Sequence, residues 1–201
     1  MPSTPPPAPV VNHADGRLRC SWCGDDPLYV RYHDTEWGVP VREDAALFEL
    51  LCLEGAQAGL SWITVLRKRD NYRRAFDGFD AARMARYTPR RVAALMQDGG
   101  IIRNRLKVQA FVSNAQAFLE MQAQGSGLSE FVWSHRPAGR RARPRSRSDV
   151  PTATPESDAL SKALKRLGFR FVGTTICYAF MQAAGVVNDH QARCWVRATT
   201  G

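Results

Sequence analysis

The sequence predicts an all-α protein, and three observations support this. Apolar residues recur in several segments at the three- and four-residue spacing of amphipathic helices. Capping residues stand where these segments begin, and glycines stand where several of them end. Neither internal repeats nor alternating runs of useful length occur. The chain has 201 residues, 44% of them hydrophobic, which suffices for one domain with a real core.

The N-terminal half holds two irregular segments and two predicted helices. Residues 1–16 form a proline-rich stretch that we expect to be a disordered tail, so the folded domain would span 17–201. Residues 17–38 are rich in tryptophan, tyrosine, cysteine and histidine, and we expect them to be irregular. The first helix is predicted over 44–54. The second is predicted to begin at Ser61, a suitable N-cap, and to end near Phe76.

The C-terminal half adds further helices. Thr88-Pro89 puts a proline in the first turn of a short helix that ends near Met96. A two-glycine turn then precedes a helix over about 103–121. Ser157 is expected to cap a helix that ends before Gly168. The segment 174–184 is apolar nearly all round, which is typical of a buried helix.

The charge of the chain favours a polyanionic partner. Lys+Arg exceed Asp+Glu by 28 − 19 = 9, and such a balance is typical of nucleic-acid-binding proteins. An arginine-rich composition without any specific partner would give the same sum. Residues 136–154 consist largely of arginine, proline and serine, so we expect an exposed or disordered basic loop there.

Targeting signals are missing from the sequence. No apolar run approaches the roughly 20 residues of a membrane span, and MPSTPPPAPVV lacks the features of a secretory signal. An odd count of five cysteines argues against a disulfide framework. We therefore expect a cytoplasmic protein without membrane contact, and nothing suggests more than a monomer.

Glu54 stands where the first helix should carry a hydrophobic residue. Leu47, Leu50 and Leu51 define one helix face, and the next turn of that face reaches Glu54. Burying a charge without a partner is unfavourable. The carboxylate is therefore either paired with an arginine or is the working group of a pocket, and we favour the pocket.

The glycine turn in ALMQDGGIIRNRLKVQA predicts an anion site. Gly99 and Gly100 join two helices over about 91–120, and such a turn exposes backbone N–H groups to a phosphate. Arg103, Arg105 and Lys107 follow at once. Together they indicate a helix–hairpin–helix that grips a phosphate backbone without reading sequence, although any αα-hairpin needs glycine in its turn.

Cysteines and histidines near the chain ends predict a structural zinc site. Asn188 or Asp189 can cap a short last helix, on which His190 and Cys194 would share one face at i, i+4. Two cysteines and two histidines make the closed tetrahedral set of structural zinc. That site would tie residues 17–40 to residues 186–201. The predicted ligands are Cys20, His33, His190 and Cys194.

Cys23 leaves this ligand set open. It forms Cys-x2-Cys with Cys20, so that both could ligate and leave His33 free. A thioredoxin-like redox role lacks its βαβ context, and the sequence signature of zinc deaminases is missing.

Aromatic residues cluster close to the candidate metal ligands. They are Trp22, Tyr29, Tyr32 and Trp37, with Trp62 further along the chain. Aromatic rings beside a carboxylate suit a flat cationic base, because cation–π attraction contributes about 0.5–2 kcal/mol when desolvated. Each ring taken alone could equally be a core residue.

Four blocks of the chain resemble the bacterial 3-methyladenine DNA glycosylase I family. They are CSWCGDDPLYVRYHDTEWGVP, LCLEGAQAGLSWITVL, GGIIRNRLKVQA and FVGTTICYAFMQAAGVVNDH. The match runs from about Arg19 to Cys194. It implies a helix–hairpin–helix DNA glycosylase fold with a zinc-tied annex. It also implies an enzyme that flips 3-methyladenine out of alkylated double-stranded DNA and excises it by hydrolysis.

The resemblance further implies roles for individual residues. Glu54 and Tyr32 would contact the excised base, Trp62 would stack on it, and Trp22, Tyr29 and Trp37 would shape the pocket. The loop of Gln57, Ala58, Gly59 and Leu60 would press into the duplex where the base has left the stack. The same match makes Cys20, His33, His190 and Cys194 the zinc ligands.

Some features depart from the family pattern. Cys23 is unexpected, and the basic insert HRPAGRRARPRSRS either adds nonspecific DNA affinity or is disordered. No lysine lies in the hairpin turn, so we expect a monofunctional glycosylase without a lyase step. A noncatalytic zinc-stabilised DNA-binding module would explain the charge, the hairpin and the ligands, but not the carboxylate on a buried stripe. A glycosylase for another damaged base stays open.

Overall fold

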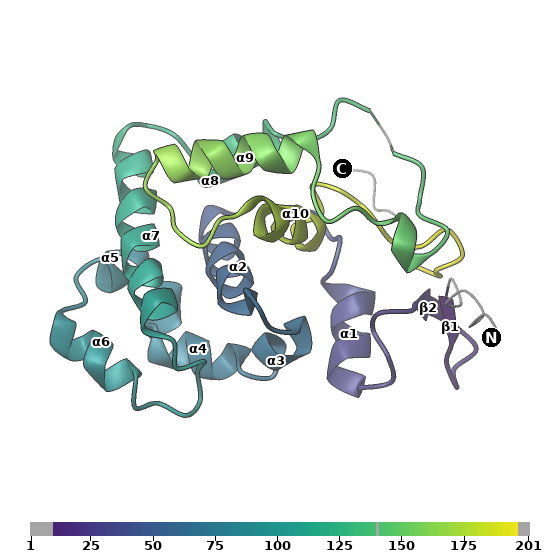
Figure 1. The fold of residues 1–201 in the computed structure, drawn as a ribbon, viewed down its shortest axis with the longest axis horizontal. Helices are drawn as coiled ribbons and strands as arrows, with labels where there is room; N and C mark the ends of the chain where they lie inside the picture. Colours follow the sequence, from purple (N-terminus) through teal and green to yellow (C-terminus); the bar gives the residue numbers. More distant parts are fainter. Residues whose placement is uncertain (1–9, 140, 197–201) are drawn as a thin grey trace, which may run out of the picture.

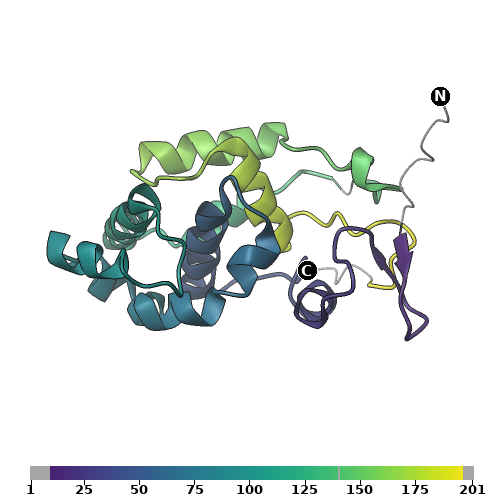
Figure 2. The ribbon, with the colours of Figure 1, turned by 60° about the horizontal axis from the view of Figure 1, so that its bottom comes forward.

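The computed structural model describes residues 10–139 and 141–196, and it is mainly helical, as predicted. Figure 1 shows a helical body built around α2, and beside it a smaller annex that contains α1 and two short strands. Figure 2 shows the same division after rotation, with the last described residues running along the annex.

The annex joins segments from both ends of the described chain. β1 (Val10–Asn12) pairs antiparallel with β2 (Leu18–Cys20), and α1 (Pro27–Thr35) follows. The backbone N–H of Trp195 donates to the carbonyl of Leu18 at 2.8 Å, so the C-terminal segment lies against β2. Two expectations need correction here. Residues 10–12 are a strand rather than tail, whereas residues 1–9 lie outside the described part.

The second correction concerns residues 17–38, which are not irregular. The Asp26 side chain accepts from the backbone N–H groups of Leu28 and Tyr29, and Pro27 occupies the first helical position. Asp-Pro is therefore the start signal of α1 that sequence analysis overlooked.

The first half of the body begins with α2 and continues through short helices. The Glu43 carboxylate caps α2, which continues three residues beyond the predicted end. The helix predicted over 61–76 is divided into two at Arg67 and Lys68, and Lys68 is the N-cap of the second helix (φ −101°, ψ −2°). The elements are α2 (Asp44–Gln57), α3 (Trp62–Leu66), α4 (Arg69–Ala75), η1 (Asp77–Phe79) and α5 (Ala81–Met84).

The second half of the body contains α6 and α7, which flank the glycine turn. Pro89 lies in the first turn of α6, as predicted, and Thr88 is its N-cap. Thr154, not Ser157, is the N-cap of α9; the two side chains form a reciprocal capping box in which Ser157 holds the third helical position. The elements are α6 (Pro89–Leu95), α7 (Arg105–Ala123), α8 (Leu128–Trp133), η2 (Arg147–Asp149), α9 (Pro155–Arg166) and α10 (Thr174–Ala183).

The last predicted helix does not form within the described residues. After α10 the segment 186–196 is irregular, and the Asn188 side chain accepts from the N–H of His190 instead of capping a helix. A short local hydrogen bond of this kind competes with helix formation.

The basic segment 136–154 is largely exposed, as expected, but it is anchored to the annex where it is described. The Arg143 guanidinium donates to the carbonyls of His190, Gln191 and Val196 at 2.9–3.0 Å, which fastens this segment to the annex. Buried carbonyls need donors, and this arginine supplies them.

The core surrounds α2. Phe48 and Leu51 are fully buried, and the Phe48 ring stacks on Phe118 of α7 with centroids 5.0 Å apart. α10 contacts both α2 and α9 and closes the other side of the core. In the part of the chain that the structure describes, no helix is long and apolar enough to cross a membrane.

Candidate active site

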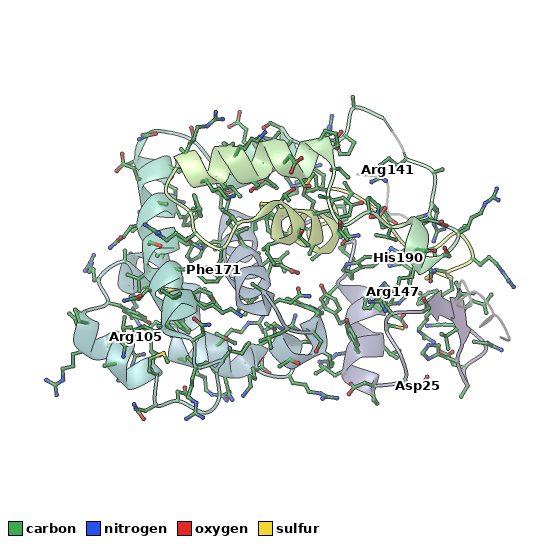
Figure 3. All side chains as sticks on the ribbon, in the orientation of Figure 1. Asp25, Arg105, Arg141, Arg147, Phe171 and His190 are labelled. Carbon is green, nitrogen blue, oxygen red and sulfur yellow. The ribbon has the colours of Figure 1, made fainter. Side chains whose placement is uncertain are left out.

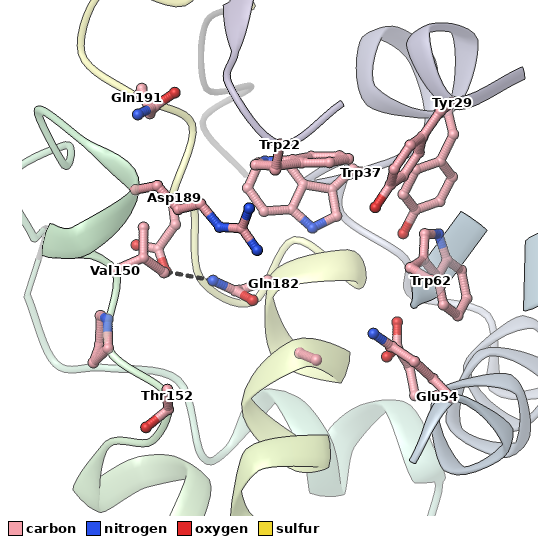
Figure 4. A pocket seen from close by; sticks show the side chains of 15 residues that line it. Trp22, Tyr29, Trp37, Glu54, Trp62, Val150, Thr152, Gln182, Asp189 and Gln191 are labelled. Atoms are coloured by element: carbon pink, nitrogen blue, oxygen red, sulfur yellow. Dashed lines mark hydrogen bonds between the residues drawn. The ribbon is translucent and has the colours of Figure 1, made fainter. Parts of the chain in front are cut away.

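A cavity of about 310 Å³ opens between the helical body and the annex (Figure 4). α1, the end of α2 and the start of α3 form one wall, while α10 and residues 147–152 form the other. Six side chains predicted for the base site line this cavity. They are Trp22, Tyr29, Tyr32, Trp37, Glu54 and Trp62.

Glu54 lies at the inner end of the cavity with little access to water. The residue is 2% exposed, and its Oε2 has no hydrogen-bond partner among the described residues. Burial raises the pKa of this carboxyl from 4.5 to about 8. The indole Nε1 of Trp62, also buried, has no partner in the described part either. Unsatisfied polar atoms in a cavity indicate a ligand that would satisfy them.

The aromatic rings form a connected wall around this carboxylate. The Tyr32 and Trp62 centroids are 5.4 Å apart with their planes inclined by 45°. Trp22 contacts Tyr29 and Trp37 at centroid distances of 5.0 and 4.9 Å. Figure 4 shows these rings on the side of the cavity that faces Glu54. The arrangement can hold a flat ring between aromatic faces and a carboxylate.

A candidate metal cluster lies behind the aromatic wall. The ligand atoms of Cys20, His33 and Cys194 lie within 4.8 Å of one another, and all three residues are buried. Hydrogen bonding, chiefly from the Cys20 thiol, lowers the pKa of the Cys194 thiol, which favours the thiolate that metals bind. The His33 Nδ1 atom is 2.8 Å from Asp34 Oδ1, which orients its other nitrogen towards the cluster.

His190 lies beside this cluster but is not one of the three residues whose ligand atoms come together. Its ring centroid is 5.1 Å from that of His33, and its Nε2 is buried without a partner among the described residues. Gly38 makes this position possible, because a Cβ there would lie 2.9 Å from the His190 ring. Figure 3 places His190 at the annex end of the molecule.

Cys23 is buried but turned away from these residues. Its Sγ is 3.6 Å from the Gly24 carbonyl oxygen and 3.9 Å from His13 Nε2. The three clustered ligands do not include it. This geometry favours the ligand set in which Cys20, rather than the Cys20–Cys23 pair, serves with His33.

α6 and α7 contact each other on either side of the glycine turn, and this turn is less open than expected. The N–H of Gly100 donates to Asp98 Oδ1 at 2.7 Å, so one of the anticipated donors is already occupied. A Cβ at Gly100 would lie 2.5 Å from the Asn71 amide nitrogen, so a larger residue there would displace the Asn71 side chain. Arg103 and Arg105 are exposed beside the turn and remain candidates for phosphate contacts; Arg105 is labelled in Figure 3.

The comparisons with known proteins agree with this architecture. The family model described as methyladenine glycosylase matches residues 22–198. DNA-3-methyladenine glycosylase 1 of Escherichia coli is 55% identical over 179 residues, which are 88% of this chain and 95% of that protein. The chain belongs to the methyladenine glycosylase family.

Solved structures carry the same fold. A crystal structure of 3-methyladenine DNA glycosylase I has a TM-score of 0.87 at 54% identity, covering 89% of this chain and 99% of that one. A variant of 3-methyladenine DNA glycosylase I in complex with 3-methyladenine has a TM-score of 0.80 at 37% identity, covering 85% and 92%. The methyladenine glycosylase fold thus extends over nearly all described elements.

Sequence analysis missed the far wall of the cavity in this methyladenine glycosylase. Gln182 and Asp189 line it, and the Gln182 amide donates to Asp189 Oδ2 at 2.8 Å (Figure 4). Gln182 is the only amide within the apolar segment TTICYAFMQAAG, and that isolated polar group was the available signal. Arg147 of the basic segment also lines the cavity, which no sequence pattern indicated.

Lys107 is placed differently from the prediction. It was expected among the DNA contacts, but it is only 6% exposed, and its ammonium donates to the carbonyls of Ala56 and Ala58. The side chain points from α7 to the end of α2 rather than to solvent. A phosphate contact from Lys107 is therefore not supported by this structure.

Proposed function

We propose that this protein is a monofunctional DNA glycosylase that flips 3-methyladenine out of alkylated double-stranded DNA and hydrolyses its bond to the sugar, leaving an abasic site. The observation that carries the proposal is the buried, unpartnered carboxylate of Glu54 inside an aromatic cavity. The family membership and the relatives named as DNA-3-methyladenine glycosylases support it.

The carboxylate accounts for selection of a methylated base. Methylation at N3 gives the adenine of DNA a positive charge and weakens its bond to the sugar. Burial raises the pKa of Glu54, because a negative charge at this place in the cavity is poorly solvated. A cationic base restores that solvation, whereas neutral adenine does not, so binding favours the damaged base.

The aromatic wall supplies shape and further selectivity. Trp62 and Tyr32 would lie against the flat base. Gln182 and Asp189 offer further polar groups on the opposite wall. Flipping costs a few kcal/mol, and stacking in the cavity offsets part of that cost.

The DNA-binding surface would combine the hairpin with the loop after α2. Arg103, Arg105 and the glycine turn would contact backbone phosphates. Gln57 lines the cavity, and Leu60, 42% exposed, lies in the chain between Gln57 and the cavity residue Trp62. An exposed apolar side chain in this place suits insertion into the duplex.

A structural zinc ion would hold the annex together. Cys20, His33, His190 and Cys194 would be its ligands, and bound zinc would supply cross-linking of the chain segments rather than chemistry. The residues present fit this group, because the two thiols and the His33 imidazole lie together and the nearby His190 Nε2 is buried without a partner among the described residues. The ring of the proposed ligand His33 stacks on Trp37 of the aromatic wall. A rigid metal cluster would therefore also fix the position of that wall.

A lyase step has no support in the described residues. Schiff-base chemistry needs a free amine in the cavity. No lysine lines that cavity among the described residues, and the Lys107 ammonium is bound to two carbonyls outside it. Hydrolysis that leaves an abasic site is the reaction these residues allow.

The test is base release from methylated duplex DNA, with the freed bases identified by chromatography. Wild type should release 3-methyladenine, and Glu54→Gln should release it far more slowly while binding DNA almost equally. Release of 7-methylguanine as well would indicate a broader specificity than proposed. DNA binding without any base release would contradict the enzyme and favour the noncatalytic DNA-binding module.

A further inference from the structure

Lys107 is a buried cation that the proposed mechanism does not use. It lies in the first turn of α7, directly after the hairpin arginines. Its Nζ donates to Ala56 O at 2.8 Å and to Ala58 O at 2.6 Å. Among the ion pairs of the described residues none includes Lys107, so these two backbone dipoles are its observed charge partners.

The two acceptors lie where α2 ends. The last carbonyls of a helix lack intrahelical donors and carry the negative end of its dipole, which a cation stabilises. Ala56 belongs to the last turn of α2, and Ala58 is its C-cap. Burial lowers the pKa of the Lys107 ammonium. Keeping this ammonium buried is energetically unfavourable. Its retention indicates that the position it gives to the end of α2 is important.

That geometry belongs to the loop between two cavity residues. The loop leaves α2 after Gln57, turns at Gly59 with φ +77°, and enters α3 at Trp62. Its own backbone adds one short hydrogen bond, from the N–H of Leu60 to Gln57 O at 2.6 Å. Lys107 is thus the contact by which α7 holds the start of this loop.

We propose that Lys107 is a positioning residue that couples the DNA-gripping hairpin to the loop 57–60, so that Leu60 reaches the duplex at the height needed to replace the flipped nucleotide. The inference rests on the proposed glycosylase function. Lys107 lies three residues after Asn104, the N-cap of α7, and contacts the loop directly. One rigid helix turn therefore links the hairpin and the loop 57–60, the two surfaces proposed to meet the DNA. Small misplacements of such groups are costly because the reacting geometry is narrow.

The test compares duplex and single-stranded substrates. Lys107→Met removes the ammonium and keeps a similar side-chain volume; Lys162→Met, on the exposed face of α9, is the matched control. Single-turnover base release is measured on a methylated duplex and on the same methylated strand alone, together with binding of free 3-methyladenine. A single strand needs no opening of a base-paired stack.

The expected result is a selective loss on duplex DNA. Lys107→Met should release base from the duplex about 10- to 100-fold more slowly than wild type, with a much smaller loss on the single strand and nearly unchanged affinity for free 3-methyladenine. Lys162→Met should match wild type throughout. Lys107→Gln, which keeps an amide donor, should release base from the duplex at a rate between those of Lys107→Met and Lys162→Met. It replaces Lys107→Met in the test if that variant does not fold.

Several results would overturn the inference. Equal losses on duplex, single strand and free base would show that Lys107 only supports the fold. An unchanged duplex rate would show that the loop needs no such contact. A decrease of about one in the slope of log DNA affinity against log salt would instead show that Lys107 contacts a DNA phosphate. Failure of wild type to release any base would refute the proposed function itself, not the role of Lys107 within it.

Discussion

The guanidinium of Arg143 and the backbone carbonyl of Gln191 lie 2.9 Å apart, so the basic segment is fastened to the C-terminal segment that carries His190 and Cys194. Further bonds from Arg143 reach the carbonyls of His190 and Val196. One side chain therefore fixes the backbone of the segment that supplies two of the proposed zinc ligands.

Arg143→Ala should loosen that segment. Hydrogen bonds that involve a charged group contribute about 1.5–3 kcal/mol, and we expect thermal unfolding to show a loss of this size and faster metal loss to a chelator. Arg145→Ala is the matched control, because Arg145 is exposed in the same segment. Identical melting and metal retention in the two variants would contradict the role of Arg143.

Glu54 should make the protein less stable as the pH rises. Its pKa is raised from 4.5 to about 8 by burial, so between these values the folded state holds a proton that the unfolded chain has released. The free energy of unfolding therefore falls with rising pH across this window.

Glu54→Gln lacks this titration. Its melting temperature relative to wild type should therefore increase from pH 5 to pH 8, as measured by thermal unfolding at several pH values. Glu120→Gln, on an exposed position of α7, should follow the wild-type profile. A constant difference between Glu54→Gln and wild type would mean that the buried carboxyl does not titrate in this range.

Metal content should distinguish the cysteines. Purified protein is expected to hold one zinc per chain, and Cys194→Ala should lose it and melt at a lower temperature, because metal binding stabilises the folded state. Cys23→Val should keep its zinc, since the Cys23 thiol faces Gly24 and His13. Loss of zinc from Cys23→Val would show that Cys23 is a ligand.

The hairpin arginines should contribute to DNA affinity through salt-dependent contacts. Each lost phosphate contact lowers the slope of log affinity against log salt by about one, so Arg103→Ala and Arg105→Ala should each flatten that dependence. Arg166→Ala, exposed on α9, is the control. Binding titrations at several salt concentrations measure the slopes, and unchanged slopes in both hairpin variants would remove this surface from the DNA interface.

Sequence patterns predicted the helices whose signals are local. Thr88-Pro89 begins α6, and the stripe that leads to Glu54 is part of α2. Caps and periodic apolar residues act over a few positions, so they can be read directly. The break at Lys68 and the irregular segment around His190 escaped prediction. The Lys68 ammonium donates to the distant Gly99 carbonyl, and the segment around His190 combines the local bond to Asn188 with a distant bond from Arg143.

The sequence by itself determined the family, the helical class, the identity of the buried carboxylate and three residues that come together, Cys20, His33 and Cys194. Only the tertiary structure decided which side chains face which space. It turned Lys107 inward, ordered the basic segment through Arg143, and placed Gln182 and Asp189 opposite Glu54. The spacing of residues predicts which helix face each one occupies. The space that its side chain points into depends on packing between elements distant in the chain.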